Sequence, residues 1–255
     1  MIFLTGDVHH MSMRGLDQIR NAGLGSEVRA CRDYLEIANG HGLMPTLFFT
    51  GKCALEEDAA IADLLRDFQF ELGGHTWDAY KNRWLLAISR RLMGLANGPR
   101  FWQRRDMSLT LQIFESRFGR RITAWRNHAY RQDRNTCALA RNLGITHVSN
   151  LVGSADWQPR RVLPEVWELP INTPPDHESL GHGNLPRQYS IHGWVDQVTA
   201  QAEWQAAHGT PTVILAHPWC MWIEDRMAGF RRLCQLLKSH PSAMISAYGG
   251  NSGTA

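Results

Sequence analysis

The sequence has 255 residues, of which 44% are hydrophobic and 20% charged, the proportions of a folded globular protein rather than a disordered or fibrous one. Its 27 basic and 24 acidic residues leave a formal net charge of +3, and so small an excess gives no reason to expect nucleic acid or a membrane surface as partner. No repeat, low-complexity tract or linker divides it, so we expect residues 1–255 to form one domain.

The first half of the chain alternates strand-like runs with segments of helical spacing. Val28, Cys31, Leu35 and Ala38 lie three or four residues apart and predict a helix that ends at a glycine-rich turn. Short runs rich in β-forming residues predict strands between the helices. In chain order we expect a strand at 2–5, a helix at 28–39, a strand at 45–50, a helix at 56–68, a strand at 70–72, and helices at 83–96 and 108–118.

The second half continues the alternation. We expect a strand at 122–125, a helix at 135–143, strands at 145–151 and 166–171, a polar loop at 172–187, a helix at 195–208, a strand at 212–215, a helix at 227–237 and a last strand at 243–247. Strands that alternate with helices are typical of an α/β protein with a mostly parallel sheet and helices outside it.

Four predicted strands end in residues that can carry chemistry. Asp7 follows the first strand, His75 follows Glu-Leu-Gly-Gly, Arg126 follows Ile-Thr-Ala-Trp, and His217 follows Val-Ile-Leu-Ala. In parallel α/β folds the carboxyl ends of the strands meet at one side of the sheet, where active sites gather. The four side chains are therefore predicted to form one site.

The same segments resemble the polysaccharide deacetylases, the NodB homology domain of carbohydrate esterase family 4. His41 to Lys52 and Phe70 to Trp77 are similar to that family's Pro-Ala-Thr-Phe-Phe strand and Glu-Ile-Gly-Asn-His-Thr motif. Four further stretches resemble its other motifs in the correct order: Leu4 to Asp7, Arg126 to Tyr130, Asp156-Trp157 and Leu215 to His217. The resemblance covers residues 2–247 and implies a distorted seven-stranded (β/α) barrel.

The resemblance also implies a reaction, the hydrolysis of an N-acetyl or related amide on a sugar with a bound divalent metal. It makes Asp7 the general base, His217 the general acid and His75 a metal ligand. Arg126 would pair with Asp7 and keep it ionised. It also implies that Asp156, Trp157, Tyr130 and Trp77 contact the substrate.

Two positions depart from the family at the metal site. Val8 stands where the family has a second aspartate, and Ala79 stands where it has a second histidine. One hypothesis is a rebuilt site. Asp7 and His9 lie two residues apart and share one face of an extended strand, so Asp7, His9 and His75 could hold zinc or another transition metal, with His10 and His128 nearby. The other hypothesis is that metal binding has been lost.

Other features refine the function. The loop at 172–187 is polar and could place Asp176, His177 or Glu178 over the substrate. The sequence lacks Gly-x-Ser-x-Gly, Gly-x-Gly-x-x-Gly and a phosphate-binding loop, which argues against a serine nucleophile or a nucleotide cofactor. We therefore expect a deacetylase-like hydrolase of a carbohydrate or small amide. The alternative is a catalytically inactive, carbohydrate-binding protein.

The cysteines and the first residues indicate a compartment. The five cysteines are widely spaced and include no Cys-x-x-Cys pair, which favours reduced thiols. The first residues lack the basic start and long apolar run of a signal peptide, and no apolar stretch approaches the roughly 20 residues that cross a bilayer. We expect a cytoplasmic protein without a membrane span.

Overall fold

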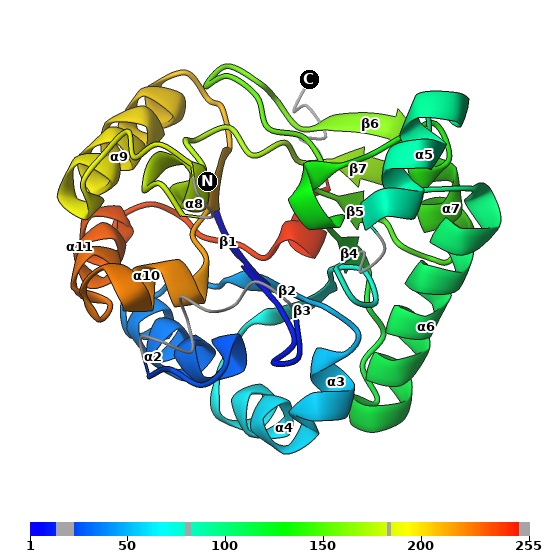
Figure 1. Ribbon diagram of the computed structural model, residues 1–255. Helices are drawn as coiled ribbons and strands as arrows, with labels where there is room; N and C mark the ends of the chain where they lie inside the picture. Colours follow the sequence, from blue (N-terminus) through cyan, green and yellow to red (C-terminus); the bar gives the residue numbers. More distant parts are fainter. Residues whose placement is uncertain (14–22, 80–82, 183–184, 250–255) are drawn as a thin grey trace.

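A computed structural model describes residues 1–13, 23–79, 83–182 and 185–249. Its strands form one curled eight-stranded sheet in the order β6-β7-β5-β4-β3-β2-β1-β8 (Figure 1). All neighbouring pairs are parallel except β6 with β7. The strands are β1 (Ile2–Val8), β2 (Thr46–Phe49), β3 (Glu71–Gly74), β4 (Ala124–Trp125), β5 (His147–Val148), β6 (Arg160–Leu163), β7 (Val166–Glu168) and β8 (Thr212–Leu215).

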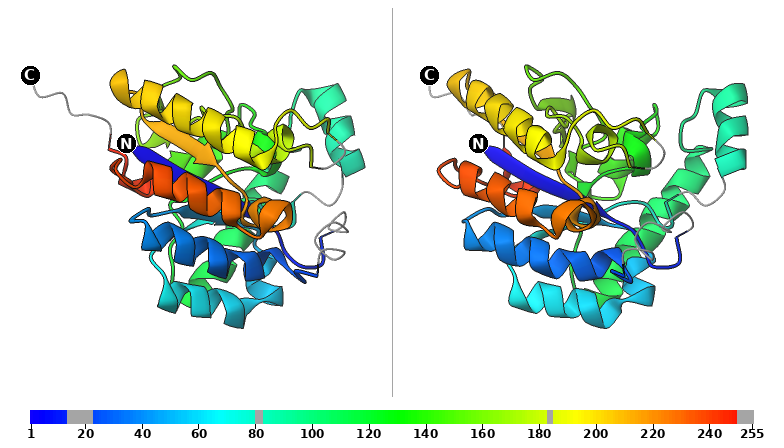
Figure 2. Two further views of the ribbon diagram at one scale, coloured as in Figure 1. Left: turned by 90° about the vertical axis from the view of Figure 1, so that its left-hand side faces the viewer. Right: turned by 60° about the vertical axis from the view of Figure 1, so that its left-hand side comes forward.

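Helices cover the outside of this sheet, as the alternating pattern predicts. Figure 2 shows α9, α11, α2 and α4 stacked in a layer along one side. The helices are α2 (Glu27–Gly40), α3 (Cys53–Glu56), α4 (Asp58–Asp67), α5 (Arg83–Met93), α6 (Arg100–Phe118), α7 (Thr136–Asn142), α8 (Asp176–Ser179), α9 (Ile191–Ala207), α10 (Pro218–Asp225) and α11 (Ala228–Leu237), with 3-10 turns η1 (His128–Tyr130) and η2 (Ile245–Ala247). No helix in the described ranges is both long and apolar enough to cross a membrane.

The predicted barrel is confirmed as a fold, with two corrections. Seven strands are parallel, and β6, which we did not predict, adds an eighth by pairing antiparallel with β7. The strand predicted at 243–247 is wrong. Ile245–Ala247 forms the turn η2 instead of extending the sheet. Ile245 belongs to the cluster of buried side chains that includes Phe3, Phe48 and Val213, which we call the inner core. An isolated bridge from Ile2 to Ser242 marks where this segment approaches β1.

Strand β1 shows how the sheet sorts its side chains. Ile2, Leu4 and Val8 pack in the core between the sheet and the helices. Phe3 belongs to the inner core, and the Thr5 and Asp7 side chains on the same face contact Arg126. This alternation has the period of two that an extended strand imposes. It sends Asp7 toward the interior of the barrel and Val8 away from it.

Candidate active site

The structure brings together the four residues predicted at strand ends. Asp7 is the second-last residue of β1, and His75, Arg126 and His217 directly follow β3, β4 and β8. All four side chains are buried. The Oδ2 atom of Asp7 lies 3.7 Å from Nε2 of His75 and 3.8 Å from Nε2 of His217. The Asp7 carboxylate is therefore the centre of the cluster.

Arg126 holds the Asp7 carboxylate in place. Its Nη1 donates to Oδ1 of Asp7 at 2.9 Å, and its other donors bond to Thr5 and to both oxygens of Ser149. Burial by itself would raise the pKa of Asp7, but His75, Arg126 and His217 lower it well below its ordinary value. Because His75 is neutral near pH 7, the charges of Arg126 and His217 account for this effect. Asp7 is ionised, with Oδ2 facing the two imidazoles.

Asp176 fixes the orientation and the protonation state of His217. Nδ1 of His217 donates to Oδ1 of Asp176 at 2.7 Å, and the His217 backbone N–H donates to Oδ2 at 2.6 Å. Burial lowers the pKa of the imidazole, but the charge and the hydrogen bond of Asp176 overcome that effect and raise it to about 9. His217 is therefore protonated at neutral pH, and its Nε2–H points toward Asp7.

Besides His217, three imidazoles, one of them that of His75, lie close together next to the Asp7 carboxylate. His9 follows β1, His75 follows β3 and His128 lies in η1, and one ring nitrogen from each lies within 4.8 Å of the others. Nδ1 of His75 donates to the Arg126 carbonyl at 2.9 Å, so its Nε2 carries a lone pair. That Nε2 is buried and has no hydrogen-bond partner. Burial lowers the pKa of His75 to about 3, which keeps this nitrogen unprotonated.

Glu27 fixes the orientation of His9. Its carboxylate accepts from Nδ1 of His9 at 3.0 Å and from the His9 backbone N–H at 2.7 Å. Nε2 of His9 is then left as an acceptor, and it lies 3.1 Å from Nδ1 of His128. Two nitrogens bound to one tetrahedral zinc ion at its usual bond length are about 3.3 Å apart. The three imidazoles thus fit a divalent transition metal, and a carboxylate behind a ligating imidazole is the usual support for one.

The candidate metal-binding group differs in one member from the predicted set of Asp7, His9 and His75. His128 joins His9 and His75 in this group, and Asp7 lies beside it with Oδ1 bonded to Arg126 and Oδ2 3.7 Å from Nε2 of His75. The structure also places the two residues that depart from the motifs. Val8 packs in the core between the sheet and the helices, on the face opposite Asp7, and Ala79 is buried with a positive φ of 54°.

Strained backbone accompanies the imidazoles. Thr76, Ala129 and Tyr130 all have left-handed φ values, of 64°, 58° and 53°. This conformation costs roughly 1–2 kcal/mol for a residue with a Cβ atom. It follows His75 in one loop and His128 in the other, so the strain lies where the fold turns these two rings toward Asp7.

The predicted substrate residues separate into two groups. Tyr130 is partly buried, 6.4 Å from the ring of His177, and Trp77 lies partly exposed two residues after His75, its N–H held by Asp106. Asp156 and Trp157 do not lie at the cluster. The side-chain amide of Asn172 donates to the backbone carbonyls of both Trp157 and Pro211. Because Pro211 precedes β8, this segment lies at the amino end of that strand, whereas His217 lies beyond its carboxyl end.

Other polar residues also find definite places. His10 turns away from the three imidazoles and bonds to Thr50. In the loop at 172–187, of which residues 183 and 184 lie outside the described ranges, Asp176 and His177 face His217, with the two rings 5.4 Å apart. Sequence reasoning missed Glu27 entirely. An acidic residue in the first turn of a helix is expected there because it interacts favourably with the helix dipole, so Glu27 has an ordinary explanation. Its contact with His9 could not be predicted from the sequence.

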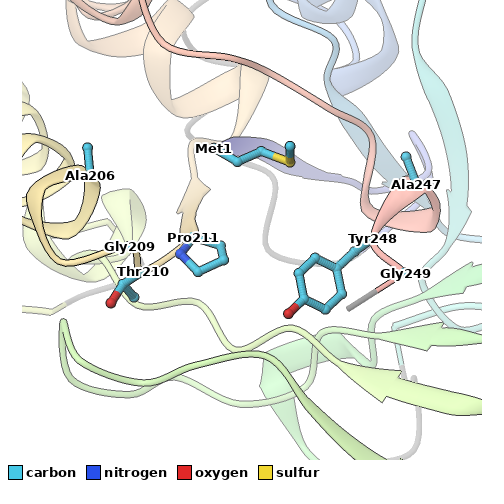
Figure 3. Close-up of a pocket in the computed structure, with 8 residues that line it drawn as sticks. All are labelled: Met1, Ala206, Gly209, Thr210, Pro211, Ala247, Tyr248 and Gly249. Carbon is cyan, nitrogen blue, oxygen red and sulfur yellow. The ribbon is translucent and has the colours of Figure 1, made fainter. Parts of the chain in front are cut away.

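A pocket lies at the other end of the sheet. Met1 and Pro211, which precede β1 and β8, line it together with Tyr248 (Figure 3). Its volume is about 370 Å³. None of the residues that converge on Asp7 lines it, so this pocket is separate from the candidate active site.

Comparisons with known proteins identify the fold. The chain matches no protein-family model, and no curated protein matches it by sequence. It is similar in structure to a protein from Mycobacterium smegmatis assigned as a polysaccharide deacetylase, with a TM-score of 0.72, 14% identity, and coverage of 96% of this chain and 85% of that one.

Two further structures are also similar. A family 4 carbohydrate esterase from Streptomyces lividans, in complex with acetate, has a TM-score of 0.56, 15% identity and coverage of 92% and 86%. A family 4 pseudoenzyme from Bacillus anthracis has a TM-score of 0.57, 13% identity and coverage of 92% and 60%. The chain therefore has the polysaccharide-deacetylase fold.

Proposed function

We propose that this chain, with its polysaccharide-deacetylase fold, is a metal-assisted hydrolase that removes an acetyl or related acyl group from the nitrogen of an amino sugar or a small amide. The observation that carries the proposal is the buried, unpartnered Nε2 of His75, which faces both the Asp7 carboxylate and two more imidazoles. The substrate class is suggested by the carbohydrate esterase with bound acetate that shares the fold.

His9, His75 and His128 would hold the metal. A divalent ion there would supply Lewis acidity, which would polarise an amide carbonyl and lower the pKa of an attacking water. Asp7 takes the proton from that water through Oδ2, while Arg126 keeps the carboxylate fixed and ionised. His217, protonated and held by Asp176, gives its proton to the departing amine nitrogen. Tyr130 and Trp77 border the cluster and would contact the substrate.

Metal content of purified variants tests the ligand set. Elemental analysis should find about one transition-metal ion per chain, most readily zinc, in the wild type. His75→Ala and His128→Ala should lose it. Asp7→Asn should keep the metal while losing turnover by at least about 100-fold, because Asp7 acts on the proton and not on the metal. If Asp7→Asn loses the metal and His128→Ala keeps it, our ligand set is wrong.

The pH dependence of turnover tests the acid. Acetate release from N-acetylated amino-sugar oligomers should decline as pH rises through about 9, where His217 loses its proton. In Asp176→Asn the decline should move toward the ordinary histidine pKa, because the partner that raises the pKa is gone. Glu178→Gln, a neighbour that does not bond His217, is the control. An unchanged alkaline limb in Asp176→Asn removes His217 from this role.

The alternative is a carbohydrate-binding protein without activity. The absence of the family's second aspartate and second histidine at Val8 and Ala79 favours it, and one structural neighbour is a pseudoenzyme. Wild-type protein that holds no metal and binds amino-sugar oligomers without releasing acetate would establish this alternative.

A further inference from the structure

Helix α5 and the first turns of α6 expose an unusual amount of apolar surface. In residues 83–105, which we call the arm, Trp84 is 72% exposed, Leu92 77% and Phe101 66%. Trp84, Ile88 and Leu92 recur every four residues, so they form one stripe along α5. On the opposite side of the helix, Leu86 and Ser89 are buried. The stripe therefore faces solvent by its position on the helix.

The charge of the arm differs from that of the rest of the chain. Between Arg83 and Arg105 the sequence has six arginines and no aspartate or glutamate, which leaves 21 basic against 24 acidic residues elsewhere. Five of these arginines are exposed, namely Arg90, Arg91, Arg100, Arg104 and Arg105. None of the five forms an ion pair with another residue in the described part of the chain. The total charge of +3 conceals this local excess.

The arm is joined directly to the candidate active site. The side chain of Asn97 donates to the Arg131 carbonyl, and Gln103 donates to Asp133, both in the loop that follows His128 and Tyr130. Asp106, next along α6, holds the Trp77 backbone N–H. Figure 2 shows α5 standing clear of the other helices, at the end toward which β1 runs. His75 and His217 directly follow β3 and β8, which run parallel to β1, β2 and one another in the sheet, so they lie at that same end. A surface that engages the arm therefore lies beside the site.

We propose that the arm binds the surface of an anionic lipid bilayer, with Trp84, Leu92 and Phe101 inserted among the headgroups and the arginines paired with lipid phosphates. An exposed stripe of Trp, Phe and Leu flanked by arginines is the composition of helices that lie in a membrane interface. A second copy of this chain fits less well, because a symmetric contact through the arm would bring two sets of arginines together. Binding there would present the active site to substrates at the membrane surface.

Vesicle co-sedimentation tests the proposal without reference to activity. The full chain should bind vesicles of phosphatidylcholine with phosphatidylglycerol and bind pure phosphatidylcholine at least tenfold more weakly. Arg90→Glu/Arg91→Glu should lower the affinity for anionic vesicles by at least about tenfold, since each cationic side chain near the surface contributes roughly 1 kcal/mol. Trp84→Ala/Leu92→Ala should lower it similarly, and bound wild type should show a blue shift of tryptophan fluorescence that this variant lacks.

Matched substitutions on other faces are the controls. Arg120→Glu/Arg121→Glu makes the same change of charge after α6, and Trp204→Ala removes an exposed tryptophan of α9, so both should bind vesicles like the wild type. Wild-type protein that does not bind anionic vesicles overturns the proposal. So does equal loss in the Arg120→Glu/Arg121→Glu control, which would show a nonspecific charge effect. A dimer in solution that Trp84→Ala/Leu92→Ala dissociates, without vesicle binding, would instead assign the arm to self-association.

Discussion

At the scale of single residues, this site is built from pairs in which a buried carboxylate or carbonyl fixes the state of an imidazole. Asp176 keeps His217 protonated, whereas the Arg126 carbonyl leaves Nε2 of His75 bare. In the proposed mechanism the same side-chain type would therefore serve as a proton donor at one position and as a metal ligand at another. The difference lies in the partner of Nδ1, which determines where the proton sits.

Glu27 makes the third of these pairs, and its contribution can be measured. Glu27→Gln keeps the shape but loses the charge that supports His9, so metal affinity should fall by roughly 10- to 100-fold, the usual effect of a support behind a ligand. Competition with a chromophoric chelator measures the affinity. Glu36→Gln removes an exposed carboxylate from the same helix and should leave it unchanged. Equal affinity in Glu27→Gln and the wild type would show that His9 does not ligate the metal.

At the scale of elements, close approach between strands positions the central arginine. A Cβ atom at Gly73 would lie 2.5 Å from the ring of Phe48, and one at Gly74 would lie 2.4 Å from that of Trp125. The Phe48 ring lies 4.4 Å from the guanidinium carbon of Arg126, so the small residues of β3 let it stack there. The Gly-Gly pair was predicted as the end of a strand. Its role in seating Arg126 follows from the neighbouring strands.

Gly73→Ala tests this packing. The added methyl group should displace Phe48 and Arg126, lowering the free energy of unfolding by about 1–3 kcal/mol, the usual cost of overpacking. Turnover should fall as well, since Arg126 orients Asp7. Urea denaturation measures the first effect. Gly40→Ala, at the end of α2 with nothing within 4 Å of the new methyl group, should be neutral or stabilising. If Gly73→Ala matches it in stability, the close approach does not constrain β3.

At the scale of the whole molecule, several buried titrating groups set the pH of greatest stability. Burial lowers the pKa of His75 to about 3 and those of His10 and His177 to about 4, so these groups add stability as pH rises toward their ordinary value of 6.5. Burial raises the pKa of Asp106 and Glu168 from about 4 to about 7, so these two groups remove stability as pH rises through that interval. His217 has a raised pKa, so its contribution is complete below pH 6.5 and is lost as pH rises through about 9.

The metal-free protein should therefore be most stable near neutral pH and lose stability from about pH 7 to 9. Urea unfolding in the presence of a chelator, at a series of pH values, measures this dependence, because metal binding would add its own pH dependence. The loss attributable to His217 is on the order of 3 kcal/mol, from the difference between its folded pKa and 6.5. His217→Gln should flatten the curve above pH 7. A variant that declines as steeply as the wild type would assign the loss to other groups.

The sequence alone determined the α/β architecture and the residues at the ends of its strands. Asp7, His75, Arg126 and His217 could be named because a strand that ends in a polar residue delivers it to the carboxyl edge of a parallel sheet, whatever the rest of the fold does. The shared face of Asp7 and His9 followed from the period of two. These inferences depend on local geometry, which the order of residues fixes.

Only the tertiary structure decided which partners those residues have. Glu27 and Asp176 meet His9 and His217 across 18 and 41 residues, and His9 meets His128 across 119. Motif likeness placed Asp156 and Trp157 at the site, but the chain carries them to the amino end of β8. The spacing of residues in sequence does not give the distance between loops in space, because that distance depends on how every intervening strand and helix packs.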